Sequence, residues 1–523
     1  MIAAVAGIAP QTARAASEFP AGDEAYHTYA EMLAEIQAAA VDHPGIVQLS
    51  SIGRSHLGRE IWMAKVSDNV TVDEDEPEVM VDGLVHAREH MSAEMALALF
   101  ATLTDQYGGG GALGRRVTSI VDSREIFIVF MANPDGGQYD ISGGQYRYWR
   151  KNRQPTPGSS SIGTDINRNF DYRWGCCGGS SATPSAWNYR GPAAWSTPEA
   201  RVLRDFVESR VVGGVQQLRV AISLHTQGRL VLWPYGWTTS DLPLDMTADD
   251  QATFVAMGTA MAASNGYTAQ QTSDLYITSG SKGDWVYERH RVFTFTFELT
   301  LGRYPDDSEI GPETSRNIDA LLYATEQADC PYRAAGLEER HCGPFSDDFE
   351  TGRGWVVNPD GTDTATSGRW ERSDPERTAD VAGTRQPGNP TSGRRGMITG
   401  PLAGGGPARY DLDGGTTTAR SRPIRLPVLV GGATHELRFR WSFAHNTKST
   451  PDDRFAAVVV NAGGTTTTVF LMQGSATDRL AFWRTATVDL SAWAGQTVSI
   501  QLEATDAGPG SLVEAGVDDL SIA

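Results

Sequence analysis

The hydrophobic pattern changes near Cys342, and this change constrains the fold more than any other feature of the 523-residue chain. Between residues 24 and 330, short apolar runs alternate with segments whose apolar residues recur at helical spacing. After Phe345 the helical spacing disappears, and short alternating runs are separated by Gly, Pro, Asp and Thr clusters. The chain is also longer than one hydrophobic core usually serves. We therefore predict an α/β domain followed by an all-β domain.

The first region contains four apolar runs that are typical of buried strands, and three segments with helical features. Their alternation predicts an α/β fold in which a mixed sheet is flanked by helices. In such sheets, functional side chains collect at the carboxyl ends of the strands. The predicted strands are residues 78–84, 125–131, 218–224 and 292–299. The first predicted helix covers residues 25–40. The second follows Ser92 as its N-cap and runs to residue 103, and the third covers residues 198–211 with Thr197 as its N-cap.

The second region has the pattern of a β-sandwich, because its short runs alternate between apolar and polar residues and turn residues separate them. The segment 361–406 is rich in Gly, Thr, Arg and Pro, and we predict long loops there. The predicted strands are residues 435–443, 455–460, 465–472, 485–490 and 497–503.

Acidic residues dominate the charge balance, with 64 Asp and Glu against 44 Lys and Arg and a formal net charge of −20. An acidic surface repels phosphate backbones, so we expect no nucleic-acid partner, although local charge in a cleft can oppose the global sign. No stretch after the N-terminus approaches the roughly 18 unbroken apolar residues that a membrane span needs. We expect a monomer that is released if it is exported.

The N-terminus has part of the pattern of an export signal. Residues 1–10 are small and apolar, and Ala13-Arg14-Ala15 forms an A-x-A-like cleavage site before Ala16. The basic segment that normally precedes the apolar run is missing, and a plain Ala-rich start is the alternative interpretation. We interpret residues 1–16 as a signal-peptide remnant and expect a secreted, extracellular protein.

Four cysteines are present, and none has the C-x-x-C spacing of a cysteine metal site. An even number in an exported chain favours disulfides. A bond between Cys330 and Cys342 would close a short loop at the end of the first domain. Cys176 and Cys177 are adjacent, so a bond between them and two separate cross-pairings both stay open.

Histidine and glutamate side chains stand at the ends of three predicted strands. His86 and Glu89 follow the first strand, His225 ends another, and Glu298 ends a third. Taken singly, each is most simply a surface or core residue. A carboxylate in so apolar a strand as that of Glu298 is costly to bury without a purpose. Two imidazoles and a carboxylate with an open position are the ligands of a catalytic zinc, whereas structural zinc usually has four protein ligands.

Further motifs accompany these residues. With them, the chain from about Tyr26 to Ala328 resembles the zinc metallocarboxypeptidases related to carboxypeptidase A and the bacterial carboxypeptidase T. The motifs occur in the order and spacing of that family. They are His86-x-x-Glu89, Trp149-Arg150-Lys151-Asn152-Arg153, Asp165-Ile166-Asn167-Arg168-Asn169-Phe170, Ser223-Leu224-His225, Trp233-Pro234-Tyr235-Gly236, Tyr276 ahead of Gly283-Asp284-Trp285, and Phe295-Thr296-Phe297-Glu298-Leu299.

The resemblance implies one Zn²⁺ ion held by His86, Glu89 and His225, with Asp165 orienting the first histidine. It implies that zinc lowers the pKa of a bound water toward ~7. Glu298 would take the proton of that water as it attacks the scissile carbonyl, and would then pass the proton to the leaving amine.

The catalytic and substrate-binding roles of the polar residues also follow from the resemblance. Arg150 would share the oxyanion charge. Arg168 would bind the free C-terminal carboxylate in bidentate fashion beside Asn167, and Tyr276 would close over it. Arg88 would contact the peptide further from its terminus. The resemblance therefore implies a peptide hydrolase that acts on peptide and protein C-termini.

Side-chain preference depends on the base of the pocket, where the family places the residue seven after the capping tyrosine. Here that residue is Gly283, which has no carboxylate and does not support strict preference for Lys or Arg. We therefore predict a hydrophobic or broad preference for the side chain of the C-terminal residue. Lys282 departs from familiar versions of the motif, and it could reach towards the pocket.

We predict a catalytic domain over residues 17–335 and an accessory domain over residues 344–523. The accessory domain resembles the jelly-roll modules of secreted hydrolases, opening with Ser346-Asp347-Asp348-Phe349-Glu350 and closing with Gly516-Val517-Asp518-Asp519-Leu520-Ser521-Ile522. Its paired acids form either a Ca²⁺ site or solvated turns, and its ligand would be a carbohydrate or a surface protein. The tryptophans that could contact a sugar or fill the core are Trp370, Trp441, Trp483 and Trp493.

Two other functions compete with peptide hydrolysis of this kind. One is a relative that acts on bacterial cell-wall peptides, and nothing in the pocket residues demands it. The other is a binding protein with an inactive peptidase domain. Inactive relatives typically lose a ligand, the base or the carboxylate-binding arginine, and this chain keeps all of them.

Overall fold

The computed structural model describes residues 18–523 except 75, 403–405, 430 and 509. The predicted signal-peptide remnant therefore lies outside the described residues. The first part is a mixed eight-stranded sheet with the order β1-β2-β4-β3-β7-β10-β8-β9. The strands are β1 (Val47–Arg54), β2 (Glu60–Val66), β3 (Glu78–Asp82), β4 (Glu125–Val129), β7 (Leu218–Thr226), β8 (Leu230–Trp233), β9 (Thr268–Gln271) and β10 (Phe293–Leu299).

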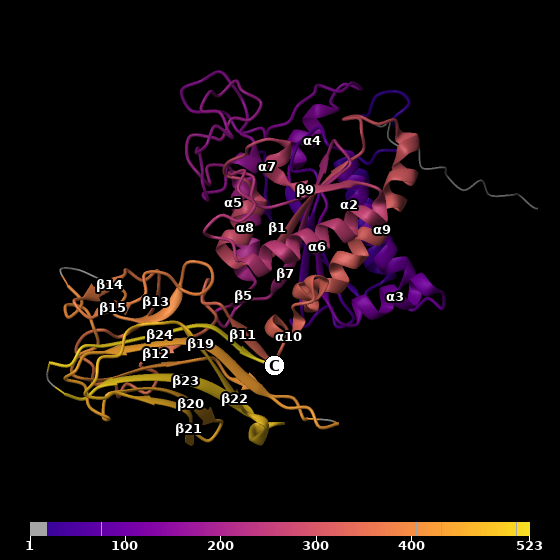
Figure 1. Cartoon of the computed structure of the whole chain (residues 1–523). Coiled ribbons are helices and arrows are strands. Elements are labelled where there is room, and N and C mark those ends of the chain that lie inside the picture. Colours follow the sequence, from indigo (N-terminus) through magenta and orange to yellow (C-terminus); the bar gives the residue numbers. More distant parts are fainter. Residues whose placement is uncertain (1–17, 75, 403–405, 430, 509) are drawn as a thin grey trace, which may run out of the picture.

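Helices cover both faces of this sheet, and a hydrophobic core lies on each face (Figure 1). On one face, Phe100 of α2 and Phe254 of α6 pack against alternate strand residues such as Val81 and Ile128. On the other face, Leu203 of α5 and Trp285 of α8 form the second core. The helices are α1 (Tyr29–Asp42), α2 (Met91–Gln106), α3 (Ala112–Val121), α4 (Pro134–Asp140), α5 (Pro198–Ser209), α6 (Ala248–Asn265), α7 (Thr272–Leu275), α8 (Lys282–His290), α9 (Ile310–Glu326) and α10 (Glu338–His341).

The four central strands β4, β3, β7 and β10 are parallel, so their carboxyl ends meet at one edge. This confirms the predicted mixed α/β sheet. The predicted cap of α2 is wrong, because the helix begins at Met91 and its N-cap is His90. Ser92 is the second residue of the helix, and its Oγ donates to the Glu89 carbonyl and accepts from the Leu84 N–H. These bonds tie the start of α2 to the loop that carries His86 and Glu89.

Two antiparallel sheets form the β-sandwich, which confirms the predicted second architecture. One sheet has the order β13-β16-β24-β19-β22 with β11 on β24, and the other β12-β17-β23-β20-β21 with β18 on β23. The strands are β11 (Phe345–Asp347), β12 (Val356–Val357), β13 (Trp370–Ser373), β16 (Gly396–Thr399), β17 (Gly415–Arg420), β18 (Ile424–Arg425), β19 (Glu436–His445), β20 (Arg454–Asn461), β21 (Thr466–Gln473), β22 (Arg484–Asp489), β23 (Thr497–Asp506) and β24 (Val513–Ile522).

The segment predicted as long loops, residues 361–406, contains β13, β16 and the hairpin of β14 (Thr378–Asp380) and β15 (Gly383–Gln386). Each of these strands has only three or four residues, which is too short for alternation to show in the sequence. The indole of Trp370 in β13 is buried, and Trp441 in β19 is buried in the same core. Two of the four tryptophans are therefore core residues.

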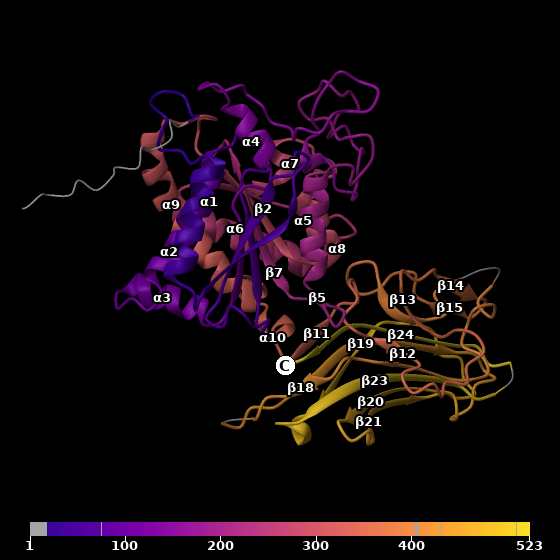
Figure 2. The same ribbon diagram turned by 180° about the vertical axis from the view of Figure 1, so that it is seen from behind.

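The sandwich packs against the end of the α/β part that is opposite α4 and α7, as both views show (Figures 1 and 2). Disulfides join Cys176 to Cys177 and Cys330 to Cys342, and the second bond lies just before the sandwich. A small β5 (Val211–Val212) and β6 (Val215–Gln216) hairpin also lies at this end. Within the described residues, no helix has the length and apolar character needed to cross a bilayer.

Candidate metal centre and substrate pocket

Three side chains converge at the carboxyl ends of β3 and β7. His86 and Glu89 lie in the loop between β3 and α2, and His225 lies in β7; all three are buried. The two histidine Nδ1 atoms are 2.9 Å apart, and the Glu89 oxygens lie 2.9 Å from the first and 2.8 Å from the second. Facing imidazole nitrogens cannot both keep a proton at that distance, so their lone pairs fit a shared cation. Two imidazoles and a carboxylate suit Zn²⁺.

The outer nitrogen of each histidine also has a partner. His86 Nε2 lies 3.2 Å from Asp165 Oδ1, as predicted for the orienting carboxylate. His225 Nε2 lies 3.2 Å from Ser223 Oγ, which donates to Asp82 Oδ1 at 2.8 Å. Such partners fix the tautomer and the ring orientation of a metal-binding histidine.

Lys282 does not reach towards the pocket, so that prediction is wrong. Its side chain is 3% exposed and pairs with the fully buried Asp82. A buried ammonium group needs a carboxylate partner, and Asp82 at the end of β3 supplies one. The lysine therefore extends the chain of polar contacts behind His225.

Glu298 stands at the end of β10, directly opposite His225 in the parallel pairing of β10 with β7. It lines one pocket together with His86 and His225. Burial raises the pKa of Glu298 to about 7, with His225 lowering it and Glu89 raising it. A carboxyl group with a pKa near neutrality is suited to taking up and releasing a proton.

Two arginines bring unpaired N–H groups into the same pocket, which we call the substrate pocket. Arg150 Nε donates to Asp165 at 2.9 Å, and its buried Nη2 has no hydrogen-bond partner among the described residues. Arg168 donates to the Asn167 carbonyl at 2.6 Å and to the Tyr276 hydroxyl at 3.3 Å, and its buried Nε likewise has no partner among the described residues. Guanidinium groups with spare donors suit a carboxylate or an oxyanion.

Most of the remaining residues that line the substrate pocket are apolar or hydroxyl-bearing, and Gly283 is one of them. Asp284 also lines the pocket, and sequence reasoning missed it. Its carboxylate accepts from the Gly236 N–H, and burial raises its pKa to about 7. The sequence feature that could have identified Asp284 as a pocket residue was its position directly after Gly283. The other residues of this wall include Leu232, Trp233, Thr272, Leu275, Thr278, Thr294 and Thr296.

Among the predicted site residues, Glu89 and Arg88 do not line the substrate pocket, and only Arg88 also lies outside the group of metal-binding side chains. It is partly buried in the loop between His86 and Glu89, and its Nη1 approaches the Tyr148 carbonyl. Its predicted contact with a more distant part of the peptide stays a prediction.

Comparison with known proteins gives the family. Residues 32–320 match the family model described as zinc carboxypeptidase. The chain belongs to the zinc carboxypeptidase family. The zinc carboxypeptidase of Saccharothrix mutabilis subsp. capreolus is 44% identical over 324 residues, which is 61% of this chain and 73% of that protein. Bovine carboxypeptidase A1 is 33% identical over 283 residues, 53% of this chain and 64% of that protein.

A solved structure agrees with the fold of the first part. The Helicoverpa armigera carboxypeptidase A superimposes with a TM-score of 0.51 and 25% identity, covering 60% of this chain and 75% of that one. This zinc carboxypeptidase therefore hydrolyses peptides, and His86, Glu89 and His225 are its zinc-binding residues. The match to the family model ends at residue 320, before the sandwich begins.

Proposed function

We propose that this zinc carboxypeptidase is secreted and removes C-terminal residues, with a hydrophobic or broad side-chain preference. The observation that carries the proposal is the placement of Arg168, Asn167 and Tyr276 in one pocket with Glu298. A guanidinium group with a spare donor, beside an amide and a partly exposed phenol, is a recognition site for a free carboxylate. Tyr276 is 41% exposed, which leaves it free to close over a bound terminus.

The chemistry is divided among three positions in the substrate pocket. Zinc supplies Lewis acidity and lowers the pKa of water to near 7. Glu298 accepts the proton of the attacking water and returns it to the leaving amine. Arg150, whose Nη2 is buried and unpaired among the described residues, stabilises the negative charge that develops on the scissile carbonyl oxygen. Arg168 and Asn167 hold the terminal carboxylate, so that the last peptide bond is the one presented.

Two features support secretion. The two disulfides suit an oxidising compartment, and they agree with the export pattern in residues 1–16.

The Ca²⁺ site predicted at the paired acids of the sandwich stays a prediction. Asp518, one of these acids, accepts from the Thr391 and Ser392 backbone N–H groups. Among the described residues, the side-chain groups close enough to hold a metal do not include the paired acids of the sandwich.

A panel of N-blocked dipeptides tests the reaction and the side-chain preference. We expect release of C-terminal Phe, Leu and Met, slower release of Lys and Arg, and loss of all activity on zinc chelation with recovery on adding zinc. The measurement is chromatography of the released amino acid. Cleavage of only Lys- and Arg-terminated peptides would contradict the preference, and cleavage that survives chelation would contradict the mechanism.

Preference should also depend on pH, because Asp284 lines the pocket and its pKa is about 7. Its ionised fraction rises from roughly a tenth at pH 6 to roughly nine tenths at pH 8. We expect the kcat/KM ratio of Lys-terminated to Phe-terminated substrate to rise up to about tenfold over this range. In Asp284→Asn the Gly236 N–H keeps an acceptor, and the ratio should stay flat. An equal rise in both proteins would rule out this role for Asp284.

A further inference from the structure

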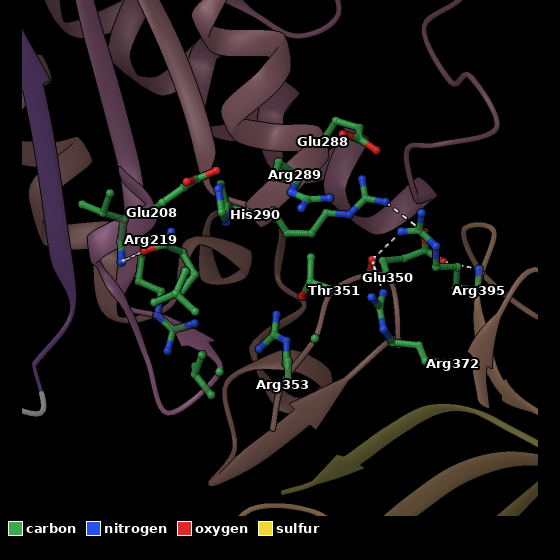
Figure 3. Close-up of a pocket in the computed structure, with 17 residues that line it drawn as sticks. Glu208, Arg219, Glu288, Arg289, His290, Glu350, Thr351, Arg353, Arg372 and Arg395 are labelled. Carbon is green, nitrogen blue, oxygen red and sulfur yellow. Dashed lines mark hydrogen bonds and ion pairs between the residues drawn. The ribbon is translucent and has the colours of Figure 1, made fainter. Parts of the chain in front are cut away.

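A second cavity, of about 500 Å³, lies between the α/β part and the sandwich. It shares no lining residue with the substrate pocket. Figure 3 shows side chains that enter it from both sides, including Arg289 of α8 and Arg372 and Arg395 of the sandwich. We call it the arginine cavity. Its size falls within the range of sites for small organic ligands.

The charge of this cavity opposes the charge of the whole protein. Six arginines and three glutamates line it, in a chain whose formal net charge is −20. Its one histidine, His290, carries no charge at neutral pH, because burial and Arg289 lower its pKa to about 4. The arginines are Arg219, Arg289, Arg291, Arg353, Arg372 and Arg395, and the glutamates are Glu208, Glu288 and Glu350.

Glu350, one of the three glutamates of the arginine cavity, already accepts hydrogen bonds at its carboxylate. The Glu350 carboxylate accepts from the backbone N–H groups of Arg394 and Arg395, both at 2.6 Å, and from Arg291 Nη2 at 3.0 Å. The guanidinium groups of Arg372 and Arg395 donate to the Glu350 carbonyl oxygen, at 3.0 and 3.1 Å, and Arg372 also donates to the Phe349 carbonyl at 3.3 Å. Glu350 therefore pairs with Arg291 and leaves these two arginines without an ion pair to its carboxylate.

Four of the cavity's guanidinium groups form no ion pair within the described residues. Of these, Arg353 is stabilised by the charges of Asp347 and Asp348, and the other three are Arg289, Arg372 and Arg395. Within the described part of the chain, none of Arg289, Arg372 and Arg395 forms an ion pair closer than 4 Å. Burial lowers the pKa of Arg372, and the charge of Arg395 lowers it further. Asp347 and Glu350 oppose this shift, and the charge of Arg289 adds a smaller lowering effect. The fold holds like charges together at a cost that a bound anion would remove.

We propose that the arginine cavity binds a phosphate-class oxyanion carried on a larger organic group, with Arg289, Arg372 and Arg395 as its ligands. Three guanidinium groups from two sides match a phosphate monoester, which offers three terminal acceptor oxygens and up to two charges. A planar carboxylate offers two oxygens and one charge, which a single arginine can satisfy. The remaining volume fits the organic part of a phosphate monoester, whereas a phosphodiester has only two terminal oxygens and one charge and is matched no better than a carboxylate. The anion would bridge the two domains.

Binding is tested on the zinc-loaded full chain with inorganic phosphate and with a short poly(glycerol phosphate), each against sodium chloride of equal ionic strength. At a phosphate concentration of about ten times the dissociation constant, we expect the Tm to rise by about 2–5 °C above the chloride control. We expect weaker binding per phosphate group of the polymer, because each of its phosphodiesters has one charge and two terminal oxygens. Equal or tighter binding per phosphate group of the polymer would overturn the assignment to a phosphate monoester. No response beyond the chloride control overturns the proposal.

Three variants locate the site. Arg289→Gln removes a ligand from the α/β side and Arg395→Gln one from the sandwich side, and each should weaken phosphate binding about tenfold or more. Arg394→Gln is the matched control, because Arg394 neighbours Arg395 in sequence but pairs with Asp374 and does not line the cavity. Its affinity should stay within about twofold of wild type.

The same variants separate this site from other anion sites on the protein. A phosphate response that is unchanged in both Arg289→Gln and Arg395→Gln would place the anion elsewhere, such as at Arg168, and would overturn the proposal. If Arg394→Gln weakened phosphate binding as much as the other two variants, the loss of any nearby positive charge would explain the result, and the proposal would also be overturned. If Arg395→Gln does not fold, the phosphate affinity of Arg289→Gln alone tests the site, because Arg289 is exposed. Peptide hydrolysis by Arg289→Gln should be unchanged.

Discussion

Replacing Glu298 with glutamine is expected to lower kcat for peptide hydrolysis by about 10²–10⁴-fold while the protein keeps its zinc. Glutamine has the same shape and can still accept a hydrogen bond, but it cannot take a proton from the attacking water. Glu298 is paired with His225 across β10 and β7, yet it is not one of the three converging metal ligands. KM should therefore change much less than kcat.

The matched control is Glu89→Gln, the same substitution at the other glutamate of this sheet edge. Glu89 contacts both histidine Nδ1 atoms, so its variant should lose zinc along with activity. Steady-state kinetics and metal analysis of the purified proteins, with circular dichroism as a test of folding, distinguish the two. A zinc-loaded Glu298→Gln variant with wild-type kcat would show that another group is the base.

The α/β sheet and the sandwich were predictable because their longer strands are continuous or alternating apolar runs. His225 and Glu298 could be placed in one site for the same reason, since each ends such a run and parallel strands end at one edge. The strands between residues 361 and 406 escaped prediction because each contributes at most two residues to a buried face. A pattern needs more repeats than that to be recognised.

The parts of the site that sequence did not predict depend on pairs of residues far apart in the chain. Lys282 pairs with Asp82, 200 positions away, and only the packing of α8 against the end of β3 brings them together. Asp284 lines the substrate pocket because α8 starts there, a direction that local spacing does not specify. The arginine cavity depends on how the sandwich packs against the α/β part, and its arginines form no local motif.

Replacing Arg168 with glutamine is expected to lower kcat/KM by about 10²–10³-fold for substrates with a free C-terminal carboxylate. Arg168 is 2% exposed, and its guanidinium group keeps one donor that is unpaired among the described residues, in the substrate pocket. A carboxylate bound there would be left without its charged partner. Substrates whose C-terminus is an amide lack that charge, so their slow hydrolysis should change little.

The decisive quantity is the ratio of kcat/KM for the free acid to that for the matching amide. It should be large in the wild type and should collapse in Arg168→Gln, while an overall loss of folding would lower both rates together. Arg173→Gln is the control, because Arg173 is five positions away, 42% exposed and absent from the pocket lining. If Arg168→Gln kept the wild-type ratio, the carboxylate would have to be bound by Arg150, whose spare Nη2 is the other unpaired guanidinium donor in the pocket among the described residues.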